Sequence, residues 1–220
     1  MYSFAQRPDT VVYDEPLYGH YLNNTPAKNY HPGADEVLST METDGEKVID
    51  MMMGDHPKEV VFFKNMGHHL LKLNTSFMRS VCNVILTRDP AEVIPSFAKE
   101  IENPSMVDIG FETQVNLLNL LNKMKAQVIV VDSNTILKNP GQELDKLCNT
   151  IGIPFFKEML AWKPGPRPED GIWAKYWYKN VHASNGFQPY KMREIILDET
   201  LQPLYQRAMP FYKQLMEFSQ

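Results

Sequence analysis

Cysteine, long apolar runs and an excess of basic residues are all lacking in this sequence of 220 residues. Its two cysteines, Cys82 and Cys148, lie far apart and without metal-like spacing. We therefore expect two reduced thiols that pack as small hydrophobic side chains, as in a reducing compartment. The formal net charge of −5 gives no general reason to expect a nucleic-acid partner or an anionic membrane surface. Any polyanion that binds must be held by a local site.

Signals for membrane insertion and metal binding are missing as well. Apolar stretches such as Val60–Phe63 are too short to span a bilayer, and the N-terminus has no basic segment followed by an apolar core. These features predict a cytoplasmic protein without a membrane partner. His20, His31, His56 and His182 have no Cys or His partners at ligand spacing, so we expect no metal site.

The composition that remains is that of a globular protein. Hydrophobic residues make up 43% and charged residues 22% of a 25.4 kDa chain, which is enough for one full-sized core. No internal repeat is evident. We expect a single domain over residues 1–220, in which residues 155–220 form a mainly helical cap.

Short apolar runs alternate with helical patterns along the chain. Four runs are typical of buried parallel strands: Thr10–Tyr13, Val60–Phe63, Asn83–Thr87 and Gln127–Val131. Helical periodicity predicts helices over Ala34–Met53, Ala91–Glu102, Ile109–Lys125 and Gln142–Ile151, and again over Trp173–Tyr178 and Tyr190–Ser219. Strands that alternate with helices indicate an α/β fold with three layers and a mainly parallel central sheet.

Polar side chains follow each predicted strand. In such folds the loops that leave the carboxyl ends of the strands gather at one edge, where ligands bind. Asp14 and Glu15 follow the first strand, Lys64, His68 and His69 the second, Arg88 the third and Asp132 the fourth. We expect these side chains at the same edge of the sheet.

The segment from Arg88 to Ser96 carries the clearest chemistry. A cation at a strand end and a hydroxyl on the second turn of the next helix can both reach one phosphate, and the helix start adds backbone N–H groups. A purely structural alternative stays open. Asp89 would then cap the helix with Pro90 in its first turn, and Arg88 would pair with a carboxylate.

At this point the sequence resembles the sulfotransferases that use 3′-phosphoadenosine 5′-phosphosulfate, in particular their bacterial and plant branch. In that family a strand ending in Arg, followed by Asp/Asn-Pro and then Ser, holds the 3′-phosphate of the nucleotide; Arg88 and Ser96 match this pattern. Further matching segments occur in order at Arg7–Tyr18, Phe63–His69, Trp162–Arg167 and Gly171–Trp177. The resemblance implies a P-loop-like α/β fold and transfer of a sulfonate group to a hydroxyl or amine of a small-molecule acceptor.

The resemblance also implies roles for individual residues. Arg88 and Ser96 would bind the 3′-phosphate, and Glu15 would be the general base, although an N-cap or ion-pair role for Glu15 is the alternative. His68 or His69 is the rival base, with at most one of them catalytic. Lys64 would neutralise charge on the leaving phosphate or simply extend from a strand end.

The late part of the chain offers weaker candidates. Lys163 and Arg167 would close over the nucleotide or belong to a solvated turn. The aromatic cluster Trp173, Tyr176, Trp177 and Tyr178 would stack on adenine, line an acceptor pocket or pack in the core.

One expected element is missing from the sequence. Sulfotransferases of this kind carry a loop between the first strand and the next helix that binds the 5′-phosphosulfate, and no such loop occurs here. Residues 1–8 are similar to the end of the helix that follows that loop. Two explanations stay open: the natural chain begins upstream of Met1, or this is the whole chain and it is a non-catalytic nucleotide-binding or interaction domain. A nucleotide kinase is disfavoured, since a glycine-rich loop ending in Lys and Ser/Thr is also absent.

Overall fold

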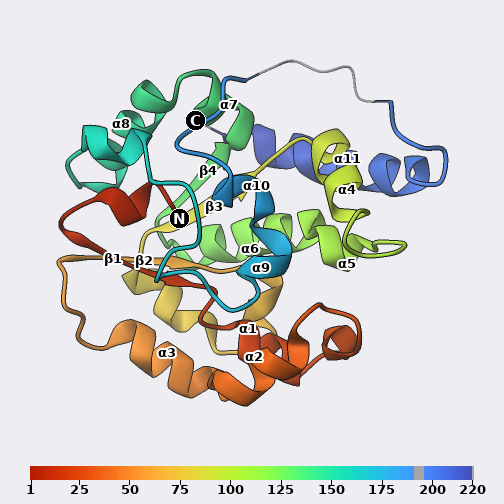
Figure 1. Ribbon diagram of the computed structural model, residues 1–220, viewed down its shortest axis with the longest axis horizontal. Coiled ribbons are helices and arrows are strands. Elements are labelled where there is room, and N and C mark those ends of the chain that lie inside the picture. Colours follow the sequence, from red (N-terminus) through yellow and green to blue (C-terminus); the bar gives the residue numbers. More distant parts are fainter. Residues whose placement is uncertain (191–195, 220) are drawn as a thin grey trace. The chain divides into compact units, whose positions relative to one another are not determined.

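The computed structural model describes residues 1–190 and 196–219 of the chain. It contains a mixture of α-helices and parallel strands (Figure 1), as predicted. The chain divides into two compact units, one built from residues 1–75 and 140–188 and the other from residues 76–139 and 189–220.

The first unit contains one pair of strands. β1 (Thr10–Asp14) and β2 (Val60–Lys64) run parallel, with Thr10 opposite Val60 and Asp14 opposite Lys64. Both strands were predicted, and each extends one residue further than the apolar run, to the polar side chain that ends it. The carboxyl ends of the two strands, Asp14 and Lys64, therefore lie side by side.

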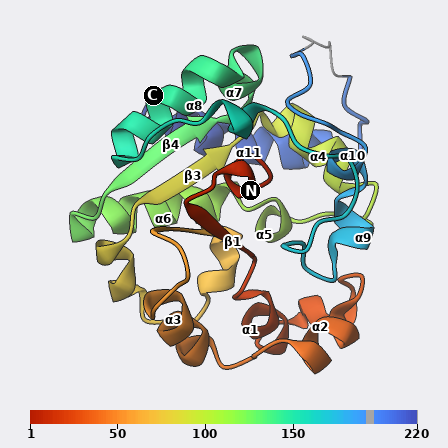
Figure 2. The same cartoon turned by 60° about the vertical axis from the view of Figure 1, so that its left-hand side comes forward.

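The first unit also contains several helices. They are α1 (Tyr18–Asn23), α2 (Ala34–Thr40), α3 (Gly45–Met53), α8 (Pro140–Ile151), α9 (Ala174–Trp177) and α10 (Lys179–His182), with short 3₁₀ turns at Phe4–Gln6, Pro26–Asn29, Gly67–Leu70 and Lys157–Leu160. α1 and α2 lie side by side (Figure 2). Trp173 is buried with Tyr18, Tyr21 and Leu22 in the apolar core that these helices share.

The predicted helix over Ala34–Met53 is wrong in one respect, because the structure has two helices there. α2 ends at Thr40, and the side chain of Asp44 then accepts a hydrogen bond from the backbone N–H of Glu46. A carboxylate that caps a new helix start favours a break in the chain over a continuous helix. The apolar periodicity of the segment did not reveal this break.

The second unit contains the other strand pair. β3 (Asn83–Thr87) and β4 (Val128–Asp132) are parallel, with Thr87 opposite Asp132. β3 matches its prediction, and β4 is shifted by one residue. Its helices are α4 (Pro90–Phe97), α5 (Met106–Ile109), α6 (Phe111–Met124), α7 (Ser133–Lys138) and α11 (Gln202–Met216), with a 3₁₀ turn at Thr75–Ser80.

Helices α6 and α11 build the core of the second unit. α6 packs on both strands, and α11 packs on α6, α4 and β4. Leu118 and Leu121 of α6 are buried, whereas Leu117 and Leu120 are half-buried. The predicted helix over Ile109–Lys125 is interrupted at Gly110, whose φ of 72° is left-handed and favours glycine.

The last part of the chain is helical in separate pieces. The prediction over Trp173–Tyr178 corresponds to α9, and that over Tyr190–Ser219 corresponds in part to α11; its residues 191–195 lie outside the described residues. Of the two cysteines, Cys148 is buried but Cys82 is exposed, so the prediction that both pack as hydrophobic side chains is wrong for Cys82. In the described ranges, no helix has the length and apolar character needed to cross a membrane.

Candidate functional site

The ends of β1 and β2 bring three charged side chains together in the first unit. Asp14 and Lys64 are register partners, and Glu15 is the next residue after β1. Glu15 has a φ of 48°, a left-handed value that is uncommon for a residue with a side chain. Its backbone N–H donates to the carbonyl oxygen of Lys64 at 2.6 Å. Such backbone conformations are often found at functional sites.

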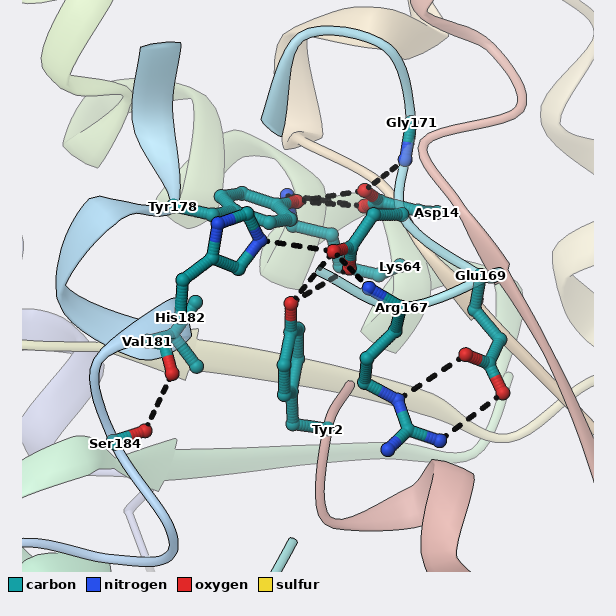
Figure 3. Close-up of polar contacts among 11 residues, drawn as sticks. Tyr2, Asp14, Lys64, Arg167, Glu169, Gly171, Tyr178, Val181, His182 and Ser184 are labelled. Carbon is teal, nitrogen blue, oxygen red and sulfur yellow. Dashed lines mark hydrogen bonds and ion pairs between the residues drawn. The ribbon is translucent and has the colours of Figure 1, made fainter. Parts of the chain in front are cut away.

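Lys64 is the centre of the group that these residues form. Its ammonium is in direct contact with Oε1 of Glu15, donates to the hydroxyl oxygen of Tyr178 at 2.7 Å and lies 3.5 Å from Oδ1 of Asp14. The hydroxyl of Tyr178 donates in turn to Asp14, at 2.8 and 2.9 Å from its two oxygens (Figure 3). The ion-pair role predicted as an alternative for Glu15 is therefore present in the structure, whereas α1 has Leu17 at its N-cap position.

Two carboxylates share one ammonium in this group, which affects their protonation. Burial raises the pKa of Glu15, the negative charge of Asp14 raises it further, and Lys64 opposes both effects. Burial would lower the pKa of Lys64, but Glu15 and Asp14 outweigh it, so the Lys64 pKa is raised. The lysine thus remains charged, and Glu15 takes up a proton more readily than an exposed glutamate.

The two predicted histidines have different environments. His69 is 1% exposed, and its Nε2 lies 4.0 Å from Oε2 of Glu15. Its ring stacks on Tyr18 with 5.2 Å between centroids, and burial holds its pKa well below the usual 6.5. His68 is half-buried, with its ring 4.6 Å from that of Tyr21. His69 thus faces Glu15 as a neutral imidazole.

A second polar group lies beside the first and was not predicted from the sequence. Asp170 accepts hydrogen bonds from the hydroxyl of Tyr2 at 2.8 Å and from the backbone N–H of Arg167 at 2.9 Å, and its Oδ2 lies 2.9 Å from Nε2 of His182 (Figure 3). The ring of His182 lies 6.1 Å from that of Tyr178. Asp170 and His182 are distant from β1 in sequence, so no local sequence motif indicated that they belong to this site.

The late cations that the sequence singled out differ in their surroundings. Lys163 is exposed. Arg167 is half-buried, pairs with Glu169 at 3.2 Å and has its guanidinium carbon 5.8 Å from the centre of the Tyr2 ring. Arg167 is thus held in this group of side chains, and Lys163 faces solvent.

The four aromatic residues proposed from the sequence as a binding cluster have different surroundings in the structure. Trp173 is buried in the core of the first unit, and Trp177 packs against that core. Tyr176 is 38% exposed. Tyr178 alone of the four reaches Asp14 and Lys64 with its side chain. The packing alternative therefore holds for the two tryptophans, and a polar role falls to Tyr178.

Arg88 and Ser96 belong to the second unit, at the end of β3 and in α4. The Arg88 side chain is 47% exposed, and its guanidinium pairs with the carboxylate of Glu92. Asp89 caps α4 by accepting from the backbone N–H of Ala91 at 2.8 Å, and Pro90 is in the first turn. Both parts of the structural alternative are thus present. Ser96 is exposed on the same helix.

These residues nevertheless have the donor groups that a phosphate requires. The guanidinium is a forked donor that remains accessible, and Ser96 adds a hydroxyl. Among the residues that the structure describes, four buried oxygens near the ends of β3 and β4 have no hydrogen-bond partner, namely Thr87 Oγ1, Asp132 Oδ1, Ser133 Oγ and Asn134 Oδ1. Unpaired buried polar atoms are uncommon in proteins, so a bound polar molecule is a reasonable source of partners. Glu92, which also accepts from Asn134 Nδ2 at 3.0 Å, competes for Arg88.

Comparison with known proteins assigns the chain to a family. A family model described as sulfotransferase domain matches residues 1–218. The chain belongs to this sulfotransferase family. The resemblance noted in the sequence is thereby confirmed at the level of the family.

Two curated relatives come from Arabidopsis thaliana and are called branched-chain-amino-acid aminotransferase-like proteins 1 and 2. They are 39% and 38% identical to this sulfotransferase-family chain over 214 residues, which cover 96% and 93% of the chain. The chain spans only 38% of the length of each relative. Among solved structures, a sulfotransferase domain from the curacin biosynthetic pathway matches 89% of this chain and 75% of its own, with a TM-score of 0.43 and 16% identity.

Proposed function

We propose that this chain catalyses transfer of a sulfonate group from 3′-phosphoadenosine 5′-phosphosulfate to a hydroxyl or amine of a small-molecule acceptor. The family assignment over residues 1–218 supports a sulfotransferase. The observation that carries the proposal is the part-buried contact between Glu15 and Lys64 at the ends of two parallel strands. It supplies a proton acceptor and a cation, which this reaction needs.

The transfer reaction requires a base that takes up the proton of the acceptor. The acceptor oxygen or nitrogen forms a bond to sulfur and loses its proton, while the bond from sulfur to the 5′-phosphate oxygen breaks and adenosine 3′,5′-bisphosphate leaves. Glu15 is the proposed base for that proton, because burial raises its pKa toward the range in which a carboxylate is an effective base. His68 is the alternative base, and its neighbour His69 has its Nε2 4.0 Å from Oε2 of Glu15.

Charge on the leaving phosphate also has to be stabilised. Lys64 is proposed for this role, since two carboxylates keep it protonated. Arg88 and Ser96 are proposed to hold the 3′-phosphate, with Lys163 and Arg167 as further nucleotide-binding residues. The exposure of the Arg88 guanidinium and its accessible donors support its part. We also propose that both units belong to one sulfotransferase-like domain of a cytoplasmic protein.

Binding of the product nucleotide tests the proposal without knowledge of the acceptor. Adenosine 3′,5′-bisphosphate is titrated calorimetrically into the 220-residue chain, after circular dichroism has shown that the chain folds, and adenosine 5′-monophosphate is the matched control. The proposal predicts saturable binding that is at least tenfold tighter for the bisphosphate, because a charge-assisted contact with the 3′-phosphate contributes about 1.5–3 kcal/mol. Equal or undetectable binding of the two nucleotides by folded protein contradicts it. Preferential binding without transfer to any acceptor would instead indicate a non-catalytic nucleotide-binding domain.

A further inference from the structure

Tyr178 connects the late part of the first unit to the end of β1. It lies between α9 and α10, and its backbone N–H donates to the carbonyl oxygen of Ala174 at 2.8 Å. Trp173, five residues earlier, is 3% exposed and anchors this turn in the apolar core. The backbone N–H of Gly171 donates to Asp14 at 3.0 Å. The contacts of Gly171 and Trp173, which precede Tyr178 in the same segment, therefore help to hold the Tyr178 hydroxyl at the end of β1.

The hydrogen bonds of this hydroxyl have a defined direction. An ionised carboxylate only accepts and an ammonium only donates, so the Tyr178 hydroxyl donates to Asp14 and accepts from Lys64. It thus forms a bridge between two residues of opposite charge that are register partners on adjacent strands. Lys64 consequently stays 3.5 Å from Asp14 and makes its direct ion pair with Glu15.

From this geometry we propose that Tyr178 is a positioning residue that holds the Lys64 ammonium against Glu15 and away from Asp14. The proposal rests on the proposed function only in that it concerns the carboxylate assigned there as the base. Without the hydroxyl, Asp14 loses a donor and Lys64 loses an acceptor, so the two charges are drawn together. Glu15 then loses part of its cation partner.

Several other groups act on Glu15 and its partners, and none of them replaces the hydroxyl. They are Asp14 of β1, Lys64 of β2, His69 of the Gly67–Leu70 turn, Tyr18 of α1 and, near Lys64 and Asp14, the amino group of Met1. Burial and Lys64 lower the pKa of the Met1 amino group to about 5, and the His69 pKa is also lowered, so both are neutral near pH 7. Lys64 is then the cation that stabilises ionised Glu15.

The test is the titration of the Glu15 carboxyl group, followed by ¹³C NMR on the full chain with labelled glutamate and assigned with Glu15→Gln. In Tyr178→Phe the ring is kept and only the hydroxyl is lost, and we expect the Glu15 titration to move upward by about one pH unit. Tyr176→Phe is the matched control, because Tyr176 is an exposed tyrosine of the same helical segment. Its Glu15 titration should coincide with that of the unaltered protein.

A second variant keeps the test valid if Tyr178→Phe does not fold. Tyr178→Gln is shorter than tyrosine and cannot place a polar group where the hydroxyl lies, so it should move the Glu15 titration in the same direction as Tyr178→Phe. A Glu15 titration that is unmoved in whichever of these two variants folds would overturn the proposal. Sulfonate transfer is not needed for this measurement, so its outcome is separate from that of the proposed function.

Discussion

Asp14 and Lys64 end two neighbouring parallel strands in register, yet the Lys64 ammonium makes its closest contact with the next carboxylate, that of Glu15. Three charges in this space carry a formal sum of one negative charge. Burial, with a smaller effect from the negative charge of Asp14, raises the pKa of Glu15 although Lys64 opposes both, and the two carboxylates raise the pKa of Lys64 despite its burial. A carboxyl group whose pKa is raised in this way is suited to acid–base chemistry.

Removal of the proposed base should abolish most of the transfer activity. Glu15→Gln keeps the size of the side chain but cannot take up the acceptor's proton, so kcat is expected to fall by about 10²–10⁴-fold while the nucleotide Kd stays the same. Glu59→Gln is the control, since Glu59 is exposed in the same unit. The measurement is the initial rate of sulfonate transfer together with calorimetric nucleotide binding. A Glu15→Gln protein with undiminished kcat rules out Glu15 as the base.

Loss of the guanidinium at the end of β3 should weaken nucleotide binding. Arg88→Ala is expected to raise the Kd for adenosine 3′,5′-bisphosphate by about tenfold or more, because a charge-assisted hydrogen bond to phosphate is lost. Arg79→Ala serves as the control, because Arg79 is an exposed arginine of the same unit. If both variants bind the nucleotide equally well, Arg88 does not contact it.

Glu92 offers a prediction of the opposite sign. Its carboxylate pairs with Arg88 and accepts from Asn134. Glu92→Gln keeps an acceptor for Asn134 but frees the guanidinium, so the bisphosphate should bind more tightly by about two- to fivefold. Calorimetry at constant ionic strength measures the change, and the Arg88→Ala background should remove it. Weaker binding in Glu92→Gln would show that Glu92 supports the nucleotide site instead of competing for Arg88.

The buried imidazole of His69 predicts a specific loss of stability in acid. Its pKa in the folded protein lies well below 6.5, so the unfolded chain binds a proton that the folded one does not as pH falls through 6.5. The stabilisation is therefore present above this pH and is lost below it, by up to about 1.4 kcal/mol per pH unit until the folded pKa is reached. His69→Phe should flatten this part of the profile. Urea unfolding at pH 7.5 and pH 5 measures the free energy of unfolding of both proteins. An equal loss of this free energy between the two pH values in His69→Phe and in the unaltered protein contradicts the prediction.

Sequence periodicity predicted the strands well because each strand is a short apolar run that ends in a polar residue. It missed the break at Asp44 and the turn at Gly110, where a capping side chain and a left-handed glycine interrupt an otherwise continuous helical pattern. Local chemistry of single residues decides such boundaries, and apolar spacing does not record it.

The candidate site was predicted only in part, for a related reason. Glu15, Lys64 and Arg88 directly follow or end strands, so their position could be inferred from the strand that precedes each. Within the first unit, Tyr178 reaches Lys64 from a segment far along the chain, and Asp170 and His182 of that segment pair with each other. Long-range packing brings them there, and a single sequence contains no signal for it.

The most direct test of the account is transfer of radioactive sulfonate from ³⁵S-labelled 3′-phosphoadenosine 5′-phosphosulfate to a panel of phenols, alcohols and amines. Nucleotide release is measured in parallel, and Glu15→Gln serves as the inactive control. The account predicts a labelled acceptor formed in step with adenosine 3′,5′-bisphosphate by the unaltered protein, and little or none by the variant. Folded protein that binds the nucleotide but labels no acceptor, or that labels one equally well without Glu15, would contradict the account.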